Sequence, residues 1–316
     1  MSVNLIICSY SGKYPRKFET NENKDKYNFL KYNLYLLNKI KTNISQITIM
    51  RPKINDNHEP IPNYYNIDNL DLSNIRDKIK FYDCENIGIS YGQFIKGIEL
   101  NDKFDYHIFT EDDYIPFKDY FEDDLISELN NTEKDSFLCL YIKKNIFWNI
   151  YEHLTPENNV MLQNQISKYN TSINSCNVPD FSLGILSKYT IEKLNNTFTN
   201  LNNVYELFKV KCDVLWHYQL LFGHILNSAK VNIHDFQDKY LNLFFEVSIN
   251  DVIFCNLQEL NKEVPLFIPL DIFYPSNNSI ILNKIKNTMT TENYTKFMNL
   301  FIKLDNTKKK YNIYYE

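Results

Sequence analysis

The chain has 316 residues, of which 44% are hydrophobic and 15% aromatic, and its formal net charge at pH 7 is −5. This length and apolar content predict a globular protein with a substantial core, built as one large α/β domain or two smaller ones. The negative charge excludes recruitment to nucleic acid by an overall positive field. Six cysteines without C-x-x-C spacing argue against a zinc site or a disulfide scaffold and favour a reducing compartment.

The sequence contains no membrane or export signal. No apolar run approaches the ~18 residues of a membrane span, and the apolar run at residues 3–8 lacks the length and basic flank of a signal peptide. We therefore expect a soluble, cytoplasmic protein. The asparagine- and lysine-rich texture is typical of an AT-rich genome, such as that of a protist, a bacterium or a large virus acting in a host cytoplasm.

The first part of the chain alternates between predicted strands and helices. Buried runs predict strands at residues 3–8, 46–50, 79–82 and 104–110, and helical spacing predicts helices at 24–41 and 90–100. Residues 51–77, which contain three prolines, predict an irregular connection. This order is typical of a mostly parallel sheet with crossover helices.

The rest of the chain continues the pattern less regularly. We expect strands at 136–142, 181–186 and 231–234 and helices at 119–129, 188–194 and 213–226. Residues 143–181 are polar and poorly periodic, which predicts a loop or lid over a site. Residues 251–316 predict a C-terminal α/β extension packed on a domain of residues 1–250, whose halves are 1–118 and 119–250.

The most informative segment follows the strand at 104–110. Glu111, Asp112 and Asp113 come directly after aromatic and β-branched residues, and three adjacent carboxylates resist ionisation unless a cation lies among them. Mg²⁺ and Mn²⁺ prefer such oxygen ligands. Because open α/β sheets bind ligands at the carboxyl ends of their strands, the segment predicts a metal and diphosphate site. A solvated acidic turn, which we expect at residues 122–124, is the alternative.

Other motifs point to competing functions. Gly88-Ile89-Ser90-Tyr91-Gly92 fits the G-x-S-x-G elbow of α/β-hydrolases, but the preceding strand does not run directly into it. The structural alternative is that Ser90 caps the following helix. The sequence has neither G-x-x-x-x-G-K-[ST] nor G-x-G-x-x-G, which argues against a P-loop kinase and a Rossmann dehydrogenase.

The histidines differ in their predicted roles. His107, in the middle of a strand, is expected to be buried and hydrogen-bonded, and His217 and His224 lie two turns apart on one helix as surface or packing residues. His234 ends a strand beside Asp235 and is a candidate metal ligand.

Taken in order, these features resemble a GT-A-fold, family-2-like glycosyltransferase. The resemblance covers residues 1–250 and runs through Cys8-Ser9-Tyr10, a strand ending in Asp83, Asn86-x-Gly88-x-Ser90 and the Glu111-Asp112-Asp113 segment in place of D-x-D. It continues through the segment from Asp180 to Gly184, the helix with Trp216 and Gln219, and the strand ending in His234-Asp235. Two positions depart from the family pattern. Glu-Asp-Asp stands where D-x-D is commoner, and Gln219 stands where a carboxylate is often found.

The resemblance implies a fold, a reaction and a set of site residues. The fold is a GT-A-like, Rossmann-like α/β fold with a mostly parallel central sheet flanked by helices. The reaction is metal-dependent transfer of a sugar from a UDP- or GDP-sugar to a hydroxyl acceptor on a glycan or protein, with Mn²⁺ or Mg²⁺ as cofactor. Asp113, Glu111 and His234 are the implied metal ligands. Cys8, Ser9, Tyr10, Asp83, Asn86, Gly88, Ser90, Glu111 and Asp112 are the implied contacts to the nucleotide-sugar.

The implied catalytic base, needed only in an inverting enzyme, is Asp213 or, failing that, Asp180. Three other functions stay open at this point. They are a serine esterase using Ser90, a nucleotidyltransferase, and a non-catalytic protein that binds sugar nucleotides.

Overall fold

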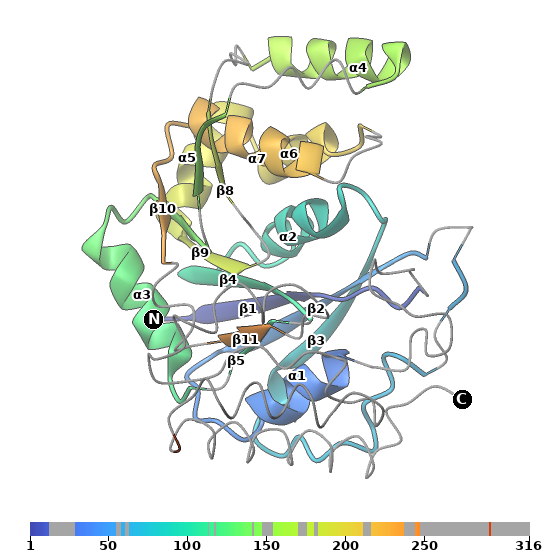
Figure 1. The fold of residues 1–316 in the computed structure, drawn as a ribbon, viewed down its shortest axis with the longest axis vertical. Helices are drawn as coiled ribbons and strands as arrows, with labels where there is room; N and C mark the ends of the chain where they lie inside the picture. The colour runs from blue at the N-terminus through green and yellow to red at the C-terminus, as the bar shows by residue number, and fades with distance from the viewer. Residues whose placement is uncertain are drawn as a thin grey trace.

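A computed structural model gives the fold of the chain (Figure 1). It describes residues 1–12, 29–54, 58–60, 63–112, 114–116, 118–140, 142–146, 154–169, 176–179, 183–210, 216–236, 244–246 and 291. Within these residues, no helix is long and apolar enough to cross a membrane.

A seven-stranded sheet forms the centre of the described molecule. Its strand order is β10 (Ile233–Asp235), β6 (Phe137–Cys139), β9 (Leu183–Ser187), β4 (Tyr106–Glu111), β1 (Val3–Cys8), β2 (Gln46–Pro52) and β3 (Ile79–Cys84). All neighbours are parallel except at β9, which runs antiparallel to both β4 and β6. Two short antiparallel pairs accompany it, β5 (Tyr114–Pro116) with β11 (Phe244–Glu246) and β7 (Ile142–Ile146) with β8 (Cys176–Pro179).

Helices cover both faces of this sheet, as Figure 1 shows with α1 on one side and α2 on the other. The helices are α1 (Phe29–Leu37), α2 (Ile89–Glu99), α3 (Phe121–Asn131), α4 (Pro156–Ser167), α5 (Lys188–Phe198), α6 (Leu201–Leu207) and α7 (Trp216–Ser228), with a short 3₁₀ turn at Arg76–Lys78. The described part therefore has the mostly parallel, helix-flanked α/β architecture that the sequence predicts.

The core on the α2 side is largely aromatic. The rings of Phe94 in α2 and Phe109 in β4 lie 5.0 Å apart, and those of Phe137 in β6 and Phe222 in α7 lie 5.4 Å apart. All four side chains are fully buried. Burying an aromatic side chain removes a large apolar area from water, so these contacts fix α2 and α7 on one face of the sheet.

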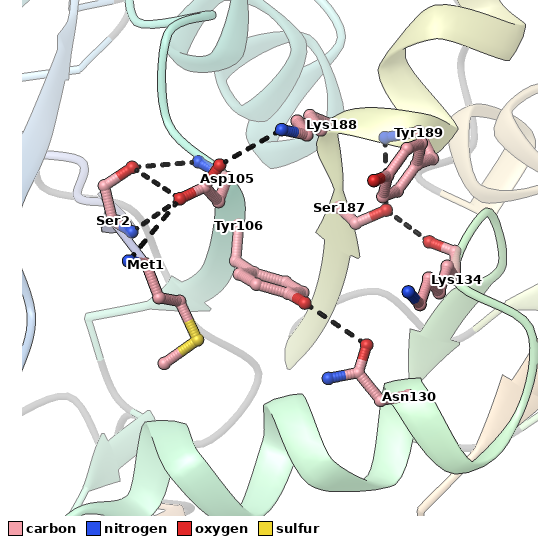
Figure 2. Close-up of polar contacts among 9 residues, drawn as sticks. All are labelled: Met1, Ser2, Asp105, Tyr106, Asn130, Lys134, Ser187, Lys188 and Tyr189. Carbon is pink, nitrogen blue, oxygen red and sulfur yellow. Dashed lines mark hydrogen bonds and ion pairs between the residues drawn. The ribbon is translucent and has the colours of Figure 1, made fainter.

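The register of β1 and β4 is held at their amino ends, which lie beside the carboxyl end of the antiparallel β9 (Figure 2). Asp105, just before β4, accepts hydrogen bonds from the backbone N–H of Ser2 (2.8 Å) and from Lys188 (3.4 Å) at the end of β9. The Ser2 N–H is the main reason that the pKa of Asp105 lies below its usual value. Tying β1, β4 and β9 together at this edge brings the opposite ends of β1 and β4 level, with Cys8 paired to Glu111.

Several predicted boundaries need correction. The helix predicted for 24–41 ends at Leu37, and its first residues lie outside the described part. The strand predicted for 136–142 is divided between β6 and β7, and the predicted loop or lid at 143–181 contains most of β7, all of α4 and all of β8. The extension predicted at 251–316 lies outside the described residues except for Thr291. The domain boundary expected after residue 250 therefore stays a prediction.

Candidate functional site

The acidic segment lies at the point where the strand order of the sheet reverses. The chain adds β2 and β3 on one side of β1 and then returns to place β4 on the other side. In doubly wound sheets, such a switch point opens a crevice at the carboxyl ends of the two flanking strands, and ligands bind there. Here β1 ends in Cys8 and is followed by Ser9 and Tyr10, and β4 ends in Glu111 and is followed by Asp112.

Asp112 is buried at this switch point. Its Oδ2 accepts hydrogen bonds from the hydroxyl of Ser9 and from the hydroxyl of Tyr64, both at 2.6 Å. Its backbone N–H donates to the carbonyl of Cys8 (3.1 Å), which extends the β1–β4 pairing by one residue. One of its two carboxylate oxygens is therefore bound within the protein.

Two further residues shape the segment, and neither was predicted. The Asn33 amide in α1 donates to the carbonyls of Asp112 (3.2 Å) and Tyr114 (3.0 Å). The hydroxyl of Tyr65 donates to the carbonyl of Ser9 (2.6 Å). Asn33 had a signal in the sequence, since it lies on the apolar stripe of its helix between Leu30 and Leu37, where a polar side chain needs a buried partner.

Tyr10 has a defined partner beyond the end of β1. Its hydroxyl lies 2.7 Å from Nδ1 of His58, and the two rings meet edge to face with centroids 5.7 Å apart. Both side chains are half-buried. The orientation of the Tyr10 ring is therefore fixed just beyond the carboxyl end of β1, beside the switch point.

Glu111 lies beside Cys8 on the α2 side of the sheet. The Cys8 thiol is 3.6 Å from the carbonyl of Ser90, in the first turn of α2. Burial raises the pKa of Cys8 well above its ordinary value, and the charge of Glu111 adds to this effect. Cys8 is therefore a neutral thiol, and Glu111 is the half-buried carboxylate next to it.

The turn before α2 shows that Ser90 does not cap the helix and does not directly follow a strand. The helix begins at Ile89 with Gly88 as its N-cap in the left-handed region (φ 65°), and no side chain caps it. Ser90 is buried rather than exposed on an elbow, and β3 ends four residues before Gly88. Packing also requires glycine at position 88, because a Cβ there would lie 2.7 Å from the Cβ of Phe208.

Asp83 is the last residue but one of β3, close to the predicted strand end. Its carboxylate pairs with the guanidinium of Arg51 in β2, with contacts of 2.9 and 3.0 Å, and remains 78% exposed. Arg51 also faces the ring of Phe81 at 5.1 Å. Asp83 therefore belongs to the carboxyl edge of the sheet, with an ion-pair partner that the sequence did not indicate.

His234 is not brought to the acidic segment. It pairs with Leu138, which pairs with Ile185 and then Ile108, so His234 is level with a residue three positions before Glu111. Three strand spacings of about 4.8 Å also put it ~14 Å to the side. A metal ion bound by both His234 and Glu111 does not fit this arrangement.

His107, His217 and His224 lie inside the protein. His107 is buried with Nδ1 3.3 Å from the Asn4 amide, as predicted. His217 and His224 are buried packing residues of α7. No group of three or more His, Cys, Asp or Glu side chains among the described residues is arranged to hold a metal ion. Asp113, Asp180 and Asp213 lie outside the described residues.

Comparisons with known proteins give distant structural likenesses. No protein-family model matches the chain. No curated protein is significantly similar to it in sequence. A solved CMP:2-keto-3-deoxy-manno-octonic acid synthetase complexed with CTP has 10% identity and a TM-score of 0.38, and covers 75% of this chain and 89% of its own.

Two further solved structures, the glycosyltransferase GlyE and TarS, give similar values. GlyE of Streptococcus pneumoniae has 10% identity and a TM-score of 0.38 over 76% of this chain, and S. aureus TarS has 12% identity and a TM-score of 0.39 over 78%. The chain spans 46% of the GlyE chain and 36% of the TarS chain. These low values leave the function of this chain to be argued from its own residues.

Proposed function

We propose that the protein is a metal-dependent glycosyltransferase that moves a sugar from a UDP- or GDP-sugar to a hydroxyl acceptor on a glycan or protein. The observation that carries the proposal is the position of the acidic segment at the switch point between β1 and β4. A crevice at such a point suits a nucleotide, and adjacent carboxylates suit a divalent cation bridging to its phosphates.

The acidic segment supplies the cation's ligands in this proposal. Hard carboxylate oxygens match Mg²⁺ or Mn²⁺, and Glu111 is a carboxylate at the sheet edge with Asp113 two positions further on. When bound, the cation neutralises charge that develops on the departing diphosphate. His234 has no place in this ligand set because of its distance along and across the sheet.

Residues on the β1 side bind the nucleotide. The Tyr10 ring, held by His58, offers an aromatic face for stacking at the mouth of the crevice. Asp83, with Arg51, presents polar groups at the carboxyl edge of β2 and β3. If the enzyme inverts the anomeric centre, Asp213 or Asp180 accepts the proton of the acceptor hydroxyl.

Thermal melting with nucleoside diphosphates, with and without Mn²⁺, tests the proposal. Ligand at 100 times its dissociation constant stabilises the folded state by about 2.7 kcal/mol, which a melting curve resolves. We expect a Mn²⁺-dependent rise in Tm with one nucleotide, lost in Asp113→Ala and kept in Asp123→Ala, a matched change on α3. The proposal fails if no nucleotide raises Tm in wild type.

Product analysis separates the remaining functions. A glycosyltransferase supplied with nucleotide-sugar releases nucleoside diphosphate, whereas a nucleotidyltransferase supplied with nucleoside triphosphate and sugar phosphate releases pyrophosphate. Binding without either product identifies a non-catalytic binding protein. Labelling of Ser90 by a fluorophosphonate would instead identify an esterase.

A further inference from the structure

We propose that Gln93 in α2 binds the nucleoside part of the donor, with its side-chain oxygen accepting a hydrogen bond from a base N–H or a ribose hydroxyl. Gln93 is not among the site residues expected from the sequence. The inference rests on the proposed function and names the group of the donor that this residue recognises.

Gln93 is a buried polar residue with an unused acceptor. Its side chain is 4% exposed, and its Oε1 has no hydrogen-bond partner in the described part of the chain. An amide oxygen that leaves water without gaining a donor destabilises the folded protein, which is why nearly all buried polar groups are paired. The unpaired oxygen therefore points to a partner that binds to the folded protein.

The packing of α2 shows which strands Gln93 faces. Gly97 packs on β1 and β2, since a Cβ there would lie 3.0 Å from Cγ2 of Ile6 and 3.3 Å from Sδ of Met50. Residues four apart on a helix share a face, so Gln93 lies over the same two strands.

The direction of α2 places Gln93 near the carboxyl ends of these strands. The Ser90 carbonyl lies 3.6 Å from the thiol of Cys8, two residues beyond Ile6, so α2 runs antiparallel to β1. The turn from Gly97 back to Gln93 spans about 6 Å, or about two strand residues. Gln93 is therefore level with Cys8, and its side chain leans further toward the start of the helix, which lies at the carboxyl edge of the sheet.

The chemistry at this level identifies the partner as a donor on the nucleoside. Cys8 donates its thiol hydrogen to the Ser90 carbonyl, and Pro52, which ends β2, has no N–H, so neither supplies a donor to Oε1. The acidic segment lies on the β4 side of β1 and Gln93 on the β2 side. A cation and diphosphate at the acidic segment leave the β2 side to the nucleoside, whose N–H and hydroxyl groups donate, whereas phosphate oxygens accept.

Titration calorimetry of the full chain with UDP and GDP, in the presence of Mn²⁺, tests the contact. Gln93→Met keeps the length of the side chain and removes the acceptor, so we expect the Kd of the nucleotide that binds to rise about three- to tenfold. Because the substitution also removes a buried unpaired oxygen, the Tm of the ligand-free protein should stay the same or rise.

Gln46→Met is the matched control. It removes an amide that bonds to Thr48 (2.8 Å) and to Asn101 (2.6 Å) at the amino end of β2, away from the carboxyl edge. We expect this variant to have a lower Tm than wild type and a nucleotide Kd within about twofold of it.

Nucleotide analogues identify the donor group. The 2′-deoxy and 3′-deoxy analogues lack a ribose hydroxyl, and N3-methyl-UDP, N1-methyl-GDP and inosine diphosphate lack a base N–H. One analogue of the nucleotide that binds should bind wild type about three- to tenfold more weakly than its parent, and this difference should disappear in Gln93→Met.

The inference is wrong if Gln93→Met binds the nucleotide as tightly as wild type. A fall in Tm as large as that of Gln46→Met would show that the amide has a partner within the fold and would also overturn it. If Gln93→Met does not fold, the analogues decide on wild type alone: equal binding of all of them overturns the inference, and one weakened analogue supports it. Wild type that binds neither UDP nor GDP would overturn the proposed function itself.

Discussion

At the scale of single residues, the acidic side chains show how strongly tertiary contacts decide the state of a carboxylate. Glu122, predicted in a solvated turn, is fully buried at the start of α3. One of its oxygens accepts hydrogen bonds from the Thr42 hydroxyl (3.0 Å) and from the backbone N–H of Asn43. The other oxygen, Oε2, is buried without a hydrogen-bond partner. Burial outweighs these bonds and raises the pKa of Glu122 above its usual value.

We predict that Glu122→Gln becomes more stable relative to wild type as pH rises. A raised carboxyl pKa means that the folded state binds the proton more tightly, so this stabilisation is present at low pH and lost as pH rises through the folded pKa. Glutamine keeps the acceptor for Thr42 and Asn43 and cannot ionise. The relative gain from pH 4.5 to 7.5 should be on the order of 1 kcal/mol in urea unfolding.

The control for this prediction is Asp123→Asn, which removes the exposed neighbouring carboxylate. The prediction is wrong if the stabilities of wild type and Glu122→Gln change in parallel over the whole pH range. That result would show that the folded state does not disfavour the ionised form of Glu122.

At the scale of elements, the start of α2 depends on a very close backbone contact. A Cβ on Gly92 would lie 1.9 Å from the carbonyl oxygen of Ile87, and that oxygen belongs to the tight turn through Gly88. Gly97, later in the same helix, faces only side chains, with Ile6 Cγ2 at 3.0 Å and Met50 Sδ at 3.3 Å. The two glycines therefore form a matched pair for substitution.

We predict that Gly92→Ala destabilises the protein by about 3 kcal/mol, because the turn must move to admit the methyl group. Gly97→Ala should change stability by less than about 1 kcal/mol, since the helix propensity of alanine offsets crowding that side chains can relieve. Denaturant unfolding of both variants measures this. Equal effects at the two positions would show that the turn adapts without strain.

The strands that consist of one short run of buried residues could be predicted from the sequence. Pairing between segments far apart in the chain could not. β1 is buried along its whole length and β4 at its four middle residues, and both strands were placed within two residues of their bounds. The β7–β8 pair was missed because Ile142 pairs with Pro179 across a long connection, and neither strand has a clear period. The antiparallel direction of β9 likewise leaves no mark in its own sequence.

The candidate site was predictable to a similar extent. The carboxylates stood out because they follow a buried strand, but the sequence could not show that Asp112 faces Ser9 and Tyr64 while Glu111 faces Cys8. That distinction depends on side-chain contacts between segments more than 45 residues apart, since Tyr64 and Asp112 are separated by 48 positions. The ion pair of Asp83 with Arg51 and the distance of His234 from Glu111 could not be predicted for the same reason, because both depend on pairing with neighbouring strands.

At the scale of the whole molecule, the two edges of the sheet have different tasks. The amino edge is held together by Asp105 with Ser2 and Lys188, as Figure 2 shows, and the carboxyl edge carries the acidic segment.

The buried histidines make the stability of the whole protein depend on pH. Burial lowers the pKa of His107 to about 3 and that of His224 to about 4, from an ordinary value of 6.5.

We predict that the folded state loses stability steeply on acidification from pH 6.5 to about 4. Both histidine pKa values are depressed, so their stabilisation is present above the unfolded pKa and lost as pH falls, because the unfolded state binds two more protons. Glu122 opposes this with up to one proton, which leaves a slope of about 1.4 to 2.7 kcal/mol per pH unit.

Part of this change of unfolding free energy with pH comes from His224 alone, and a substitution at this residue measures it. His224→Leu cannot bind the proton, so its slope should fall by about 1.4 kcal/mol per pH unit between pH 6 and 4.5, whatever its stability at neutral pH. Urea unfolding at four or five pH values gives the slope, and His224→Phe distinguishes proton linkage from altered packing, because both variants must show the same reduction. An unchanged slope in both variants would mean that His224 protonates inside the folded protein without penalty, through water reaching α7.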